Sequence, residues 1–460
     1  MLKVFSHYFP SHTLQQILFD GLLLFVTAVI AVALQLHVDE VDWGAVVPSA
    51  LAFSVVMVVL NTAMGLYRPA VGGEQREALA RVTLSLLVSV PVAFVVFSVL
   101  PWAGFMSGAM QVSVLVLLGV VLLMRGMVNR REASGLFARR TLIIGTGADA
   151  LAVQRALMHS GQSADSIVGF VPSGNDDAVD VDSRKVISGV RLMDVVGQQR
   201  VNEVIVAVRE RRGGVLPLRE LLDCKLSGIQ VLDLSSFFER VQGQVRIDSL
   251  RASWLIYGDG FRQGLGRSVV KRCFDLSMAL LLLLLALPLM LLAALLILFE
   301  DGGPVFYRQE RVGLAGRVFQ VIKFRSMRTD AEKDGKPRWA SSNDDRVTRV
   351  GRVIRKLRID ELPQLFNVLV GDMSLVGPRP ERPYFVDQLA SEIPFYGIRH
   401  CVKPGVTGWA QVRYQYGASV DDAVQKLQYD LYYVKNHTLV LDTLVLFETV
   451  RVVLTGEGAH

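Results

Sequence analysis

The sequence predicts a membrane protein in three parts: a membrane α-helical bundle, a Rossmann-like α/β domain and a mainly α monotopic domain with a re-entrant helical hairpin. Hydrophobic residues make up 51% of the 460 positions, which is too many for a soluble protein of this length. Long apolar runs occur in two separate places, within 14–124 and at 274–299. Between them, short apolar runs alternate with helical stretches, as in parallel α/β domains. We expect the boundaries 1–135, 136–265 and 266–460.

The bundle is predicted from four apolar runs at 14–36, 45–66, 82–100 and 110–124. Most of them approach the length that a bilayer crossing needs. The loops at 35–44 and 101–109 contain no Lys or Arg, whereas the other loop and the segment after the fourth run are rich in arginine. By the positive-inside rule, both ends of the bundle face the cytoplasm.

The middle domain is predicted from the strand-like runs TLIIGTG (141–147), SIVGFV (166–171) and VNEVIVAV (201–208), with a helix near 149–158. Residues 145–150, Gly-Thr-Gly-Ala-Asp-Ala, resemble half of a dinucleotide-binding fingerprint. The second strand carries no convincing acidic residue. We therefore favour a scaffold or dimerisation domain without a tightly held cofactor, and a homodimer is one expected assembly; nucleotide binding is the alternative.

The second membrane segment, 274–299, is long enough to cross a bilayer. Pro288 interrupts its middle, and basic residues flank both of its ends. A single crossing would place one basic flank outside the cell, whereas a hairpin hinged at Pro288 keeps both in the cytoplasm. We therefore predict the hairpin. The basic residues are Arg262, Arg267, Lys271 and Arg272 before it, and Arg308, Arg311, Arg317 and Lys323 after it.

Basic residues continue beyond the hairpin. Two short paired strands, the second at 319–324, place Lys323 and Arg325 near the membrane, where they would contact lipid headgroups or handle phosphate. A polar loop at 330–345 precedes a basic amphipathic helix at 346–357. The net charge of +6 suits anionic lipids and phosphorylated substrates. No nucleic-acid-binding module is evident, so no nucleic-acid partner is expected.

Asp360 and Glu361 form an adjacent carboxylate pair among arginines and lysines. Pro363 suits the first turn of a helix over 362–370, which would put the pair at the positive end of that helix, an anion-binding position. One carboxylate could attack phosphorus while the other holds a divalent cation. The alternative is a capping acid with surface ion pairs. Glycine and proline turns at 371–380 favour the first interpretation, because they fix Arg379 near the pair.

Four segments closely resemble the bacterial sugar transferases that act as polyprenyl-phosphate hexose-1-phosphate transferases, in their long form with four N-terminal membrane spans. They are LRIDELPQLFNVLVGDMSLVGPRPE (357–381), KFRSM (323–327), KPGVTGWAQV (403–412) and KLQYDLYYVKN (426–436). MLKVFSHYFP (1–10) and GFVPSGNDDAVDV (169–181) further resemble the PEP-CTERM-associated exopolysaccharide subgroup, of the undecaprenyl-phosphate glucose phosphotransferase type.

The resemblance implies transfer of hexose 1-phosphate from a UDP-hexose to polyprenyl (undecaprenyl) phosphate, with release of UMP. Asp360 would form a phosphosugar-aspartyl intermediate, and Glu361 would hold Mg²⁺. Arg355 and Arg379 would stabilise charge on the transferred group, since the guanidinium plane matches phosphate oxygens. The reaction would initiate synthesis of an exopolysaccharide or another surface glycan at the bacterial inner membrane, with the active site facing the cytoplasm.

The resemblance also places Lys323 and Arg325 on the active-site surface. Many members of the family have Asn-Gly-Arg after the Gln-Val of the third segment, and Arg413 is the nearest substitute here. Asp430 occupies a position that is usually acidic in the family, and its alternative role is an ion pair with Lys426. Trp409 is expected to be an anchor at the membrane interface.

Two other functions are kept as alternatives. One is a membrane-tethered sensor whose α/β domain binds a nucleotide, although the densest polar cluster lies outside that domain. The other is a lipid-diphosphate hydrolase, in which water replaces the lipid acceptor. The products distinguish the three functions. The transferase would make a lipid-linked sugar, the sensor would show no turnover, and the hydrolase would release inorganic phosphate.

Overall fold

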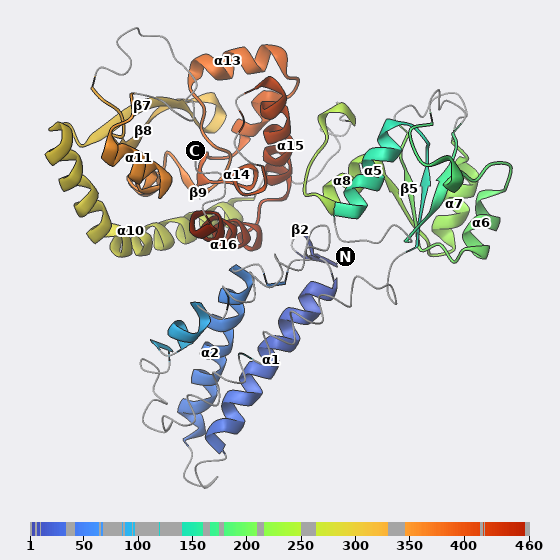
Figure 1. Ribbon diagram of the computed structural model, residues 1–460, viewed down its shortest axis with the longest axis horizontal. Coiled ribbons are helices and arrows are strands. Elements are labelled where there is room, and N and C mark those ends of the chain that lie inside the picture. Colours follow the sequence, from blue (N-terminus) through green and yellow to red (C-terminus); the bar gives the residue numbers. More distant parts are fainter. Residues whose placement is uncertain are drawn as a thin grey trace. The chain divides into compact units, whose positions relative to one another are not determined.

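The computed structural model divides into two compact units, one of residues Met1–Val4 and Tyr8–Gln242 and one of Phe5–His7 and Gly243–His460 (Figure 1). The predicted loop at 330–345, about half of the third predicted span and nearly all of the fourth lie outside the described residues. The structure describes residues 2–4, 7–9, 11–33, 42–63, 66–67, 85, 88–93, 95–96, 119, 140–159, 166–173, 179–208, 216–249, 264–329, 346–414, 417 and 419–455.

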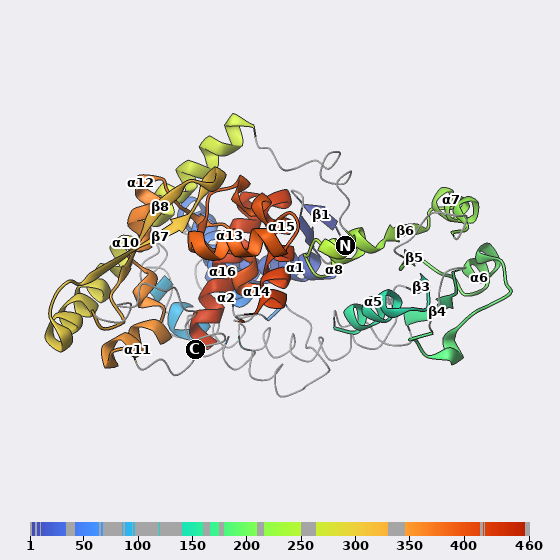
Figure 2. The ribbon, with the colours of Figure 1, turned by 90° about the horizontal axis from the view of Figure 1, so that it is seen from above.

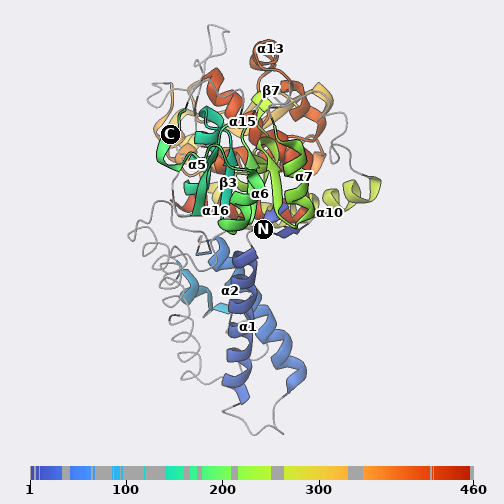
Figure 3. The same ribbon diagram turned by 90° about the vertical axis from the view of Figure 1, so that its right-hand side faces the viewer.

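The chain begins with the short strands β1 (Leu2–Val4) and β2 (His7–Phe9), followed by helices α1 (Ser11–Ala33) and α2 (Trp43–Ala63). Figure 3 shows α1 and α2 packed along each other, and the Ser54 hydroxyl donates to the Gly21 carbonyl oxygen at 2.6 Å. Residues Trp43–Thr62 of α2 are long and apolar enough to cross a membrane, whereas the apolar stretch in α1 is shorter. The two helices coincide with the first two predicted spans.

The middle domain is a parallel four-stranded sheet in the order β4-β3-β5-β6, with helices on both faces. Helices α5 and α8 pack on one face through Ile143 and Ile205, and α6 and α7 pack on the other through Leu142 and Val204. The predicted parallel α/β arrangement is confirmed. Its elements are β3 (Thr141–Ile144), α5 (Ala148–His159), β4 (Ile167–Val171), η6 (Ser183–Lys185), α6 (Leu192–Gln198), β5 (Glu203–Val206), α7 (Leu218–Leu226), β6 (Gln230–Asp233) and α8 (Leu234–Val241).

Gly145, in the predicted fingerprint, has a structural reason to be glycine. Its φ is +117°, and a Cβ atom there would lie 2.8 Å from the carbonyl oxygen of Ala207, just beyond the neighbouring strand β5. Only glycine allows this close approach without strain. Packing between β3 and β5 therefore explains Gly145, and nucleotide binding by the motif stays a prediction.

The second unit begins at Gly243, before the expected boundary at 266, because Val245 and Ile247 pack into its core. Figure 2 shows α13, α14, α15 and α16 gathered beside the β7–β8 hairpin. The elements of the second unit up to η9 are η7 (Ile247–Ser249), α10 (Leu265–Asp301), β7 (Phe306–Val312), η8 (Leu314–Gly316), β8 (Val318–Phe324), α11 (Arg349–Lys356) and η9 (Ile359–Glu361). Those after it are α12 (Gln364–Val370), β9 (Ser374–Val376), α13 (Pro383–Glu392), η10 (Tyr396–Cys401), β10 (Gly405–Thr407), α14 (Trp409–Arg413), α15 (Val420–Asn436) and α16 (Leu439–Thr455).

Trp409 lies in the core of this unit, and its prediction as an interfacial anchor is wrong. The indole is 1% exposed and stacks on Tyr432, with 5.9 Å between the ring centroids. Its Nε1 donates to the carbonyl oxygen of Gly243 at 2.8 Å. The indole N–H therefore finds its partner inside the protein rather than at a membrane surface.

Helix α10 is continuous through Pro288, and Figure 1 shows that its ribbon bends between its ends. A proline inside a helix removes a hydrogen bond and bends the axis. A hairpin broken at Pro288 was predicted; the helix is continuous at this residue, and its re-entrant path in the membrane stays a prediction. Its outer face is apolar and uncovered, as expected for a surface in lipid; the residues there include Leu280, Leu281, Leu284, Leu285, Leu291, Leu292, Leu295 and Phe299.

Both ends of α10 are fastened to the same unit. Near its start, Arg272 donates from Nη1 to the Val368 carbonyl oxygen at 2.6 Å and from Nη2 to that of Leu369 at 2.9 Å. At its end, Arg325 Nη2 donates to the carbonyl oxygens of Asp301 and Gly302 at 3.1 and 2.7 Å. Between these ends, Ala279, Met290 and Ile297 pack into the cores of the same unit, so one face of the helix lies along it.

Candidate active site

The carboxylate pair lies in a tight turn between two helices. Helix α11 ends at Lys356, and Arg358 has a φ of +59°, so the chain reverses direction before Asp360 and Glu361 in η9. Pro363 is the N-cap of α12, so the helix predicted over 362–370 forms and the pair immediately precedes it. Both carboxylates are 8% exposed.

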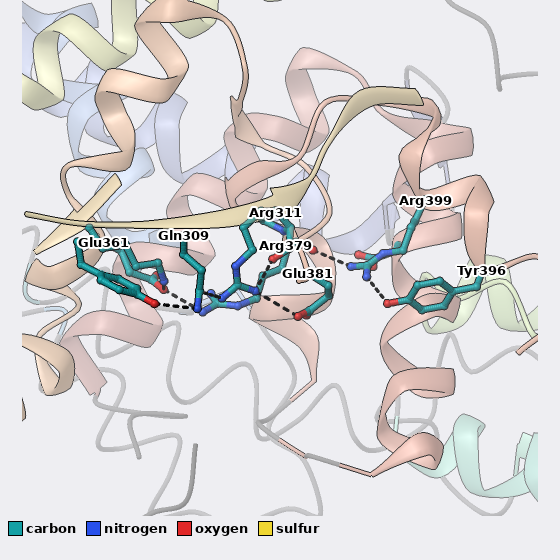
Figure 4. Close-up of polar contacts among 11 residues, drawn as sticks. Gln309, Arg311, Glu361, Arg379, Glu381, Tyr396 and Arg399 are labelled. Atoms are coloured by element: carbon teal, nitrogen blue, oxygen red, sulfur yellow. Dashed lines mark hydrogen bonds and ion pairs between the residues drawn. The ribbon is translucent and has the colours of Figure 1, made fainter. Parts of the chain in front are cut away.

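Glu361 is held between two cations. Its Oε1 accepts a hydrogen bond from Lys323 Nζ at 3.0 Å. The same oxygen accepts from Arg379 Nη2 at 2.9 Å (Figure 4). Burial would raise the pKa of Glu361, but Arg379 and Lys323 outweigh it and hold the pKa well below its usual range. The carboxylate is therefore ionised at neutral pH.

Asp360 is different, because its carboxylate makes no hydrogen bond or ion pair with any other residue in the part of the chain that the structure describes. Burial, with the adjacent charge of Glu361, raises its pKa to about 6, and Lys323 and Arg355 act in the opposite direction. At neutral pH most of this carboxylate is ionised. A buried, unpaired and ionised carboxylate is a competent nucleophile.

A pocket that is open to solvent lies beside the pair. Its lining contains three cations, Arg311, Lys323 and Arg379, together with Gln364, Val321, Pro380 and Gly405. Within the described ranges, no three His, Cys, Asp or Glu side chains cluster as metal ligands would. The pocket therefore suits an anion rich in oxygen, such as a phosphate or a diphosphate.

A second polar layer supports Arg379 from behind. Arg399 Nη2 donates to the Arg379 carbonyl oxygen at 2.9 Å and forms an ion pair with Asp430 Oδ2 at 2.8 Å. Arg399 Nη1 donates to the Tyr396 hydroxyl oxygen at 2.6 Å. Asp430 thus faces Arg399, and Lys426, its predicted alternative partner, donates to the Gly417 carbonyl oxygen.

The structure separates the remaining predicted site residues. Arg355 lies in the last turn of α11, where its charge favours ionised Asp360. Arg325 is 6% exposed and is engaged with the end of α10. Arg413 lies over the Trp409 ring, with 4.3 Å from Cζ to the centroid. Lys323 and Arg379 therefore join the carboxylate pair, whereas Arg325, Arg413 and Asp430 lie outside the pocket lining.

Sequence reasoning missed Arg311, Gln364, Arg399 and Tyr396 as parts of the site. Arg311 was counted only as one of the basic residues that flank the hairpin. Alternation along a strand puts Gln309 and Arg311 on the same side of β7, and this signal could have nominated them. Neighbouring residues in the chain do not predict the contact between Arg399 and Arg379, because it joins η10 to the turn after β9.

The family model for bacterial sugar transferases matches residues 266–456, which contain the bent helix, the pocket and the carboxylate pair. The UDP-glucose:undecaprenyl-phosphate glucose-1-phosphate transferase of Xanthomonas campestris pv. campestris is 31% identical over 350 residues, which cover 74% of this chain and 71% of the relative. The chain belongs to the bacterial sugar transferase family. The family predicted from the four sequence segments is confirmed.

Other relatives of this bacterial sugar transferase align over shorter parts. The UDP-N-acetylgalactosamine-undecaprenyl-phosphate N-acetylgalactosaminephosphotransferase of Aeromonas hydrophila is 46% identical over 279 residues, 59% of this chain and 63% of the relative. The undecaprenyl-phosphate glucose phosphotransferase of Komagataeibacter xylinus is 47% identical over 186 residues, 39% of this chain and 35% of the relative. The chain therefore matches less than two thirds of each of these two relatives.

Membership of the family agrees with the apolar helices. Two described helical segments, Trp43–Thr62 and Leu265–Asp301, are long and apolar enough to cross a bilayer. No described part of the protein covers the exposed leucines of α10. This bacterial sugar transferase is a membrane-associated protein.

Proposed function

We propose that this bacterial sugar transferase transfers a hexose 1-phosphate from a UDP-hexose to undecaprenyl phosphate and releases UMP. The observation that carries the proposal is Asp360, a buried carboxylate without a hydrogen-bonding partner in the described part of the chain, next to a cationic pocket. The relatives support the substrate classes, since their names specify undecaprenyl phosphate and, for two of them, a UDP-sugar. The reaction would begin the synthesis of an exopolysaccharide or another surface glycan.

The reaction proceeds in two displacements. An Asp360 carboxylate oxygen attacks the β-phosphorus of the UDP-hexose, and the bond from this phosphorus to the bridging oxygen breaks. The bond's electron pair leaves with UMP, and the hexose phosphate remains esterified to Asp360. A phosphate oxygen of the lipid then attacks the same phosphorus and restores the carboxylate. The two anionic substrates therefore never need to occupy the site together.

The surrounding cations fit this chemistry. Arg379 and Lys323 contact Glu361 and line the pocket, so they can stabilise the charge that develops on the phosphoryl oxygens. Arg355 favours the ionised form of Asp360. Glu361 holds Lys323 and Arg379 in place, and Arg399 with Asp430 fixes the backbone of Arg379.

Mg²⁺ is the proposed cofactor. Glu361 Oε2 has no hydrogen bond with the described residues, because both cations contact Oε1. Mg²⁺ commonly binds one or two protein carboxylates together with substrate phosphates and water, so Glu361 can hold it without a larger cluster of ligands. When bound, Mg²⁺ would neutralise charge on the diphosphate.

The proposed location is the bacterial inner membrane, with the active site facing the cytoplasm and α10 entering and leaving the bilayer from that side. The basic loops of the N-terminal bundle and the attachment of both ends of α10 to one unit support this orientation. A tag at the C-terminus should be inaccessible from outside intact cells. Labelling of that tag from the periplasm would refute the orientation.

The decisive assay incubates membranes that contain the protein with undecaprenyl phosphate, Mg²⁺ and a panel of UDP-sugars. We expect equal amounts of UMP and of a lipid-linked sugar diphosphate with at least one of these donors, and neither product with the Asp360→Asn variant. Inorganic phosphate as the product would indicate a lipid-diphosphate hydrolase. Absence of turnover with every donor would favour the membrane-tethered nucleotide sensor.

The α/β domain is proposed to be a scaffold or dimerisation domain, and the protein a homodimer. The packing role of Gly145 supports a domain that folds without a bound nucleotide. The mass of the detergent-solubilised protein, measured by light scattering, tests the assembly, and a monomer would contradict it.

A further inference from the structure

Of the three cations that line the pocket, Arg311 alone takes no part in the proposed reaction. It lies on β7 and enters the lining together with Lys323 and Arg379. Figure 4 shows Arg311 and Arg379 close together, with Glu361 on one side and Glu381 on the other. Arg311 is therefore at the site but makes no contact with the carboxylate pair.

The guanidinium of Arg311 is fixed in place by its neighbours. Nη1 donates to the Pro380 carbonyl oxygen at 3.0 Å and to Glu381 Oε2 at 3.4 Å, and Nη2 donates to Gln309 Oε1 at 2.6 Å. A guanidinium has five N–H groups, so these three contacts leave two without a protein partner in the described part of the chain. A side chain held in this way loses little entropy when a ligand binds.

Three cations of the pocket lining, Arg311, Lys323 and Arg379, lie close to one another. Glu361 forms ion pairs with both Lys323 and Arg379, at 3.0 and 2.9 Å. The ion pair between Glu381 and Arg311 is longer, at 3.4 Å. Burial lowers the pKa of Arg311; Glu381 opposes this, and the positive charges of Arg379 and Arg382 add to it. Cations that are buried and repel one another bind an anion that relieves the repulsion.

The position of Arg311 separates its role from that of the other two cations. Lys323 and Arg379 contact Glu361 and so face the phosphorus that Asp360 attacks. Arg311 belongs to the same lining but has no such contact with Glu361. A diphosphate that presents its β-phosphate to Asp360 would therefore extend its α-phosphate toward Arg311.

We propose that Arg311 binds the α-phosphate of the nucleotide sugar, the group that leaves with UMP, and so determines affinity for the donor. This inference rests on the proposed transferase function. The phosphate of the lipid has the same chemistry, so the experiment must separate the two substrates.

The test measures steady-state kinetics of the full-length protein in membranes with Arg311→Gln, varying UDP-hexose and undecaprenyl phosphate in turn. We expect KM for the UDP-hexose and the inhibition constant of UMP to rise about tenfold or more, since hydrogen bonds to charged groups are strong. KM for the lipid should stay within about twofold. Arg308→Gln is the matched control, because Arg308 is exposed on the same strand.

A second variant guards against misfolding of the first. Glu381→Gln removes the carboxylate that competes for Arg311, so UMP should inhibit about threefold more strongly or better. A misfolded site would not bind UMP more tightly. Unchanged donor KM and UMP inhibition in an active Arg311→Gln enzyme would overturn the inference, as would a rise in the lipid KM alone. Absence of UMP release by the unmodified protein would instead overturn the proposed function.

Discussion

Two buried clusters in the same unit combine carboxylates with lysine, and they differ in whether the carboxylates are paired. In the first, Lys271 bridges Asp275 Oδ1 at 2.7 Å and Asp442 Oδ2 at 3.0 Å. The other oxygens accept from the Ser374 hydroxyl, at 2.9 Å, and the Tyr433 hydroxyl, at 2.7 Å. Every carboxylate oxygen of this cluster has a donor.

In the second cluster, Lys323 and Arg379 both bind Glu361, and Asp360 has no donor among the described residues. A fully satisfied buried network stabilises one arrangement of the fold, whereas an unsatisfied buried charge is costly. The comparison indicates that the first cluster fastens α10 to α16 and that the second keeps a carboxylate reactive. Mutations in the two clusters should therefore have opposite effects.

The largest expected effect is loss of activity in Asp360→Asn. Without the nucleophile, the rate of UMP release should fall by at least about a thousandfold. Because the pKa of Asp360 is higher in the folded protein than in the unfolded chain, the protonated carboxyl stabilises the fold at pH values below the unfolded-state pKa. This stabilisation is lost as the pH rises through about 6. Asn cannot ionise, so at pH 7 the variant should unfold at the same temperature or a higher one. Asp387→Asn, an exposed carboxylate on α13, is the control.

Lys271→Met should have the opposite effect, a loss of stability without a loss of specific activity. Removal of the lysine leaves two buried carboxylates without their shared cation, which should lower the free energy of unfolding by about 3–5 kcal/mol. Thermal unfolding in detergent measures the loss, and Lys356→Met, at an exposed position, provides the comparison. The folded fraction should retain most of its specific activity. An inactive variant of normal stability would show instead that this cluster takes part in catalysis.

The pH dependence of the first displacement sharpens the comparison further. Burial raises the pKa of Asp360 to about 6, and only the ionised form attacks phosphorus. The rate of UMP release in a single turnover without lipid should be constant above about pH 7. Below about pH 6 it should fall tenfold per unit, because the ionised fraction falls by that factor. A rate that is independent of pH down to 4.5 would exclude Asp360 as the titrating nucleophile.

The smallest expected effect concerns the layer behind Arg379. Tyr396→Phe removes the hydroxyl that accepts from Arg399 at 2.6 Å, a contact that contributes about 1 kcal/mol or somewhat more. If Arg399 positions Arg379, kcat should fall about fivefold while KM for the donor changes little. Tyr384→Phe, on a side chain that is 60% exposed, should have no effect. Equal kinetics of the two variants would restrict Arg399 to a role in stability.

Much of the architecture was predictable because it depends on local periodicity. Strands β3, β4 and β5 follow from their apolar runs, and the helix that begins after Pro363 was predicted from this proline. The carboxylate pair and Arg379 were predictable because turn-forming residues keep them close along the chain. Lys323 was nominated by its position next to the membrane segment.

Other features depend on contacts between distant segments. Trp409 was placed at the membrane interface because tryptophan is common there, but its burial requires the carbonyl group of Gly243 and the ring of Tyr432. Asp430 has a lysine one turn away, and Arg399 binds it instead because η10 packs against α15. Residue type and spacing along one helix cannot reveal such partners.

The covalent state of Asp360 after exposure to the donor alone tests the central claim most directly. Protein is mixed with UDP-hexose and Mg²⁺ without lipid, digested, and analysed by mass spectrometry, while released UMP is counted. We predict a hexose phosphate on the peptide that contains Asp360 and about one UMP per enzyme molecule. An unmodified peptide with UMP release only after addition of lipid, or an adduct on another residue, would contradict the account.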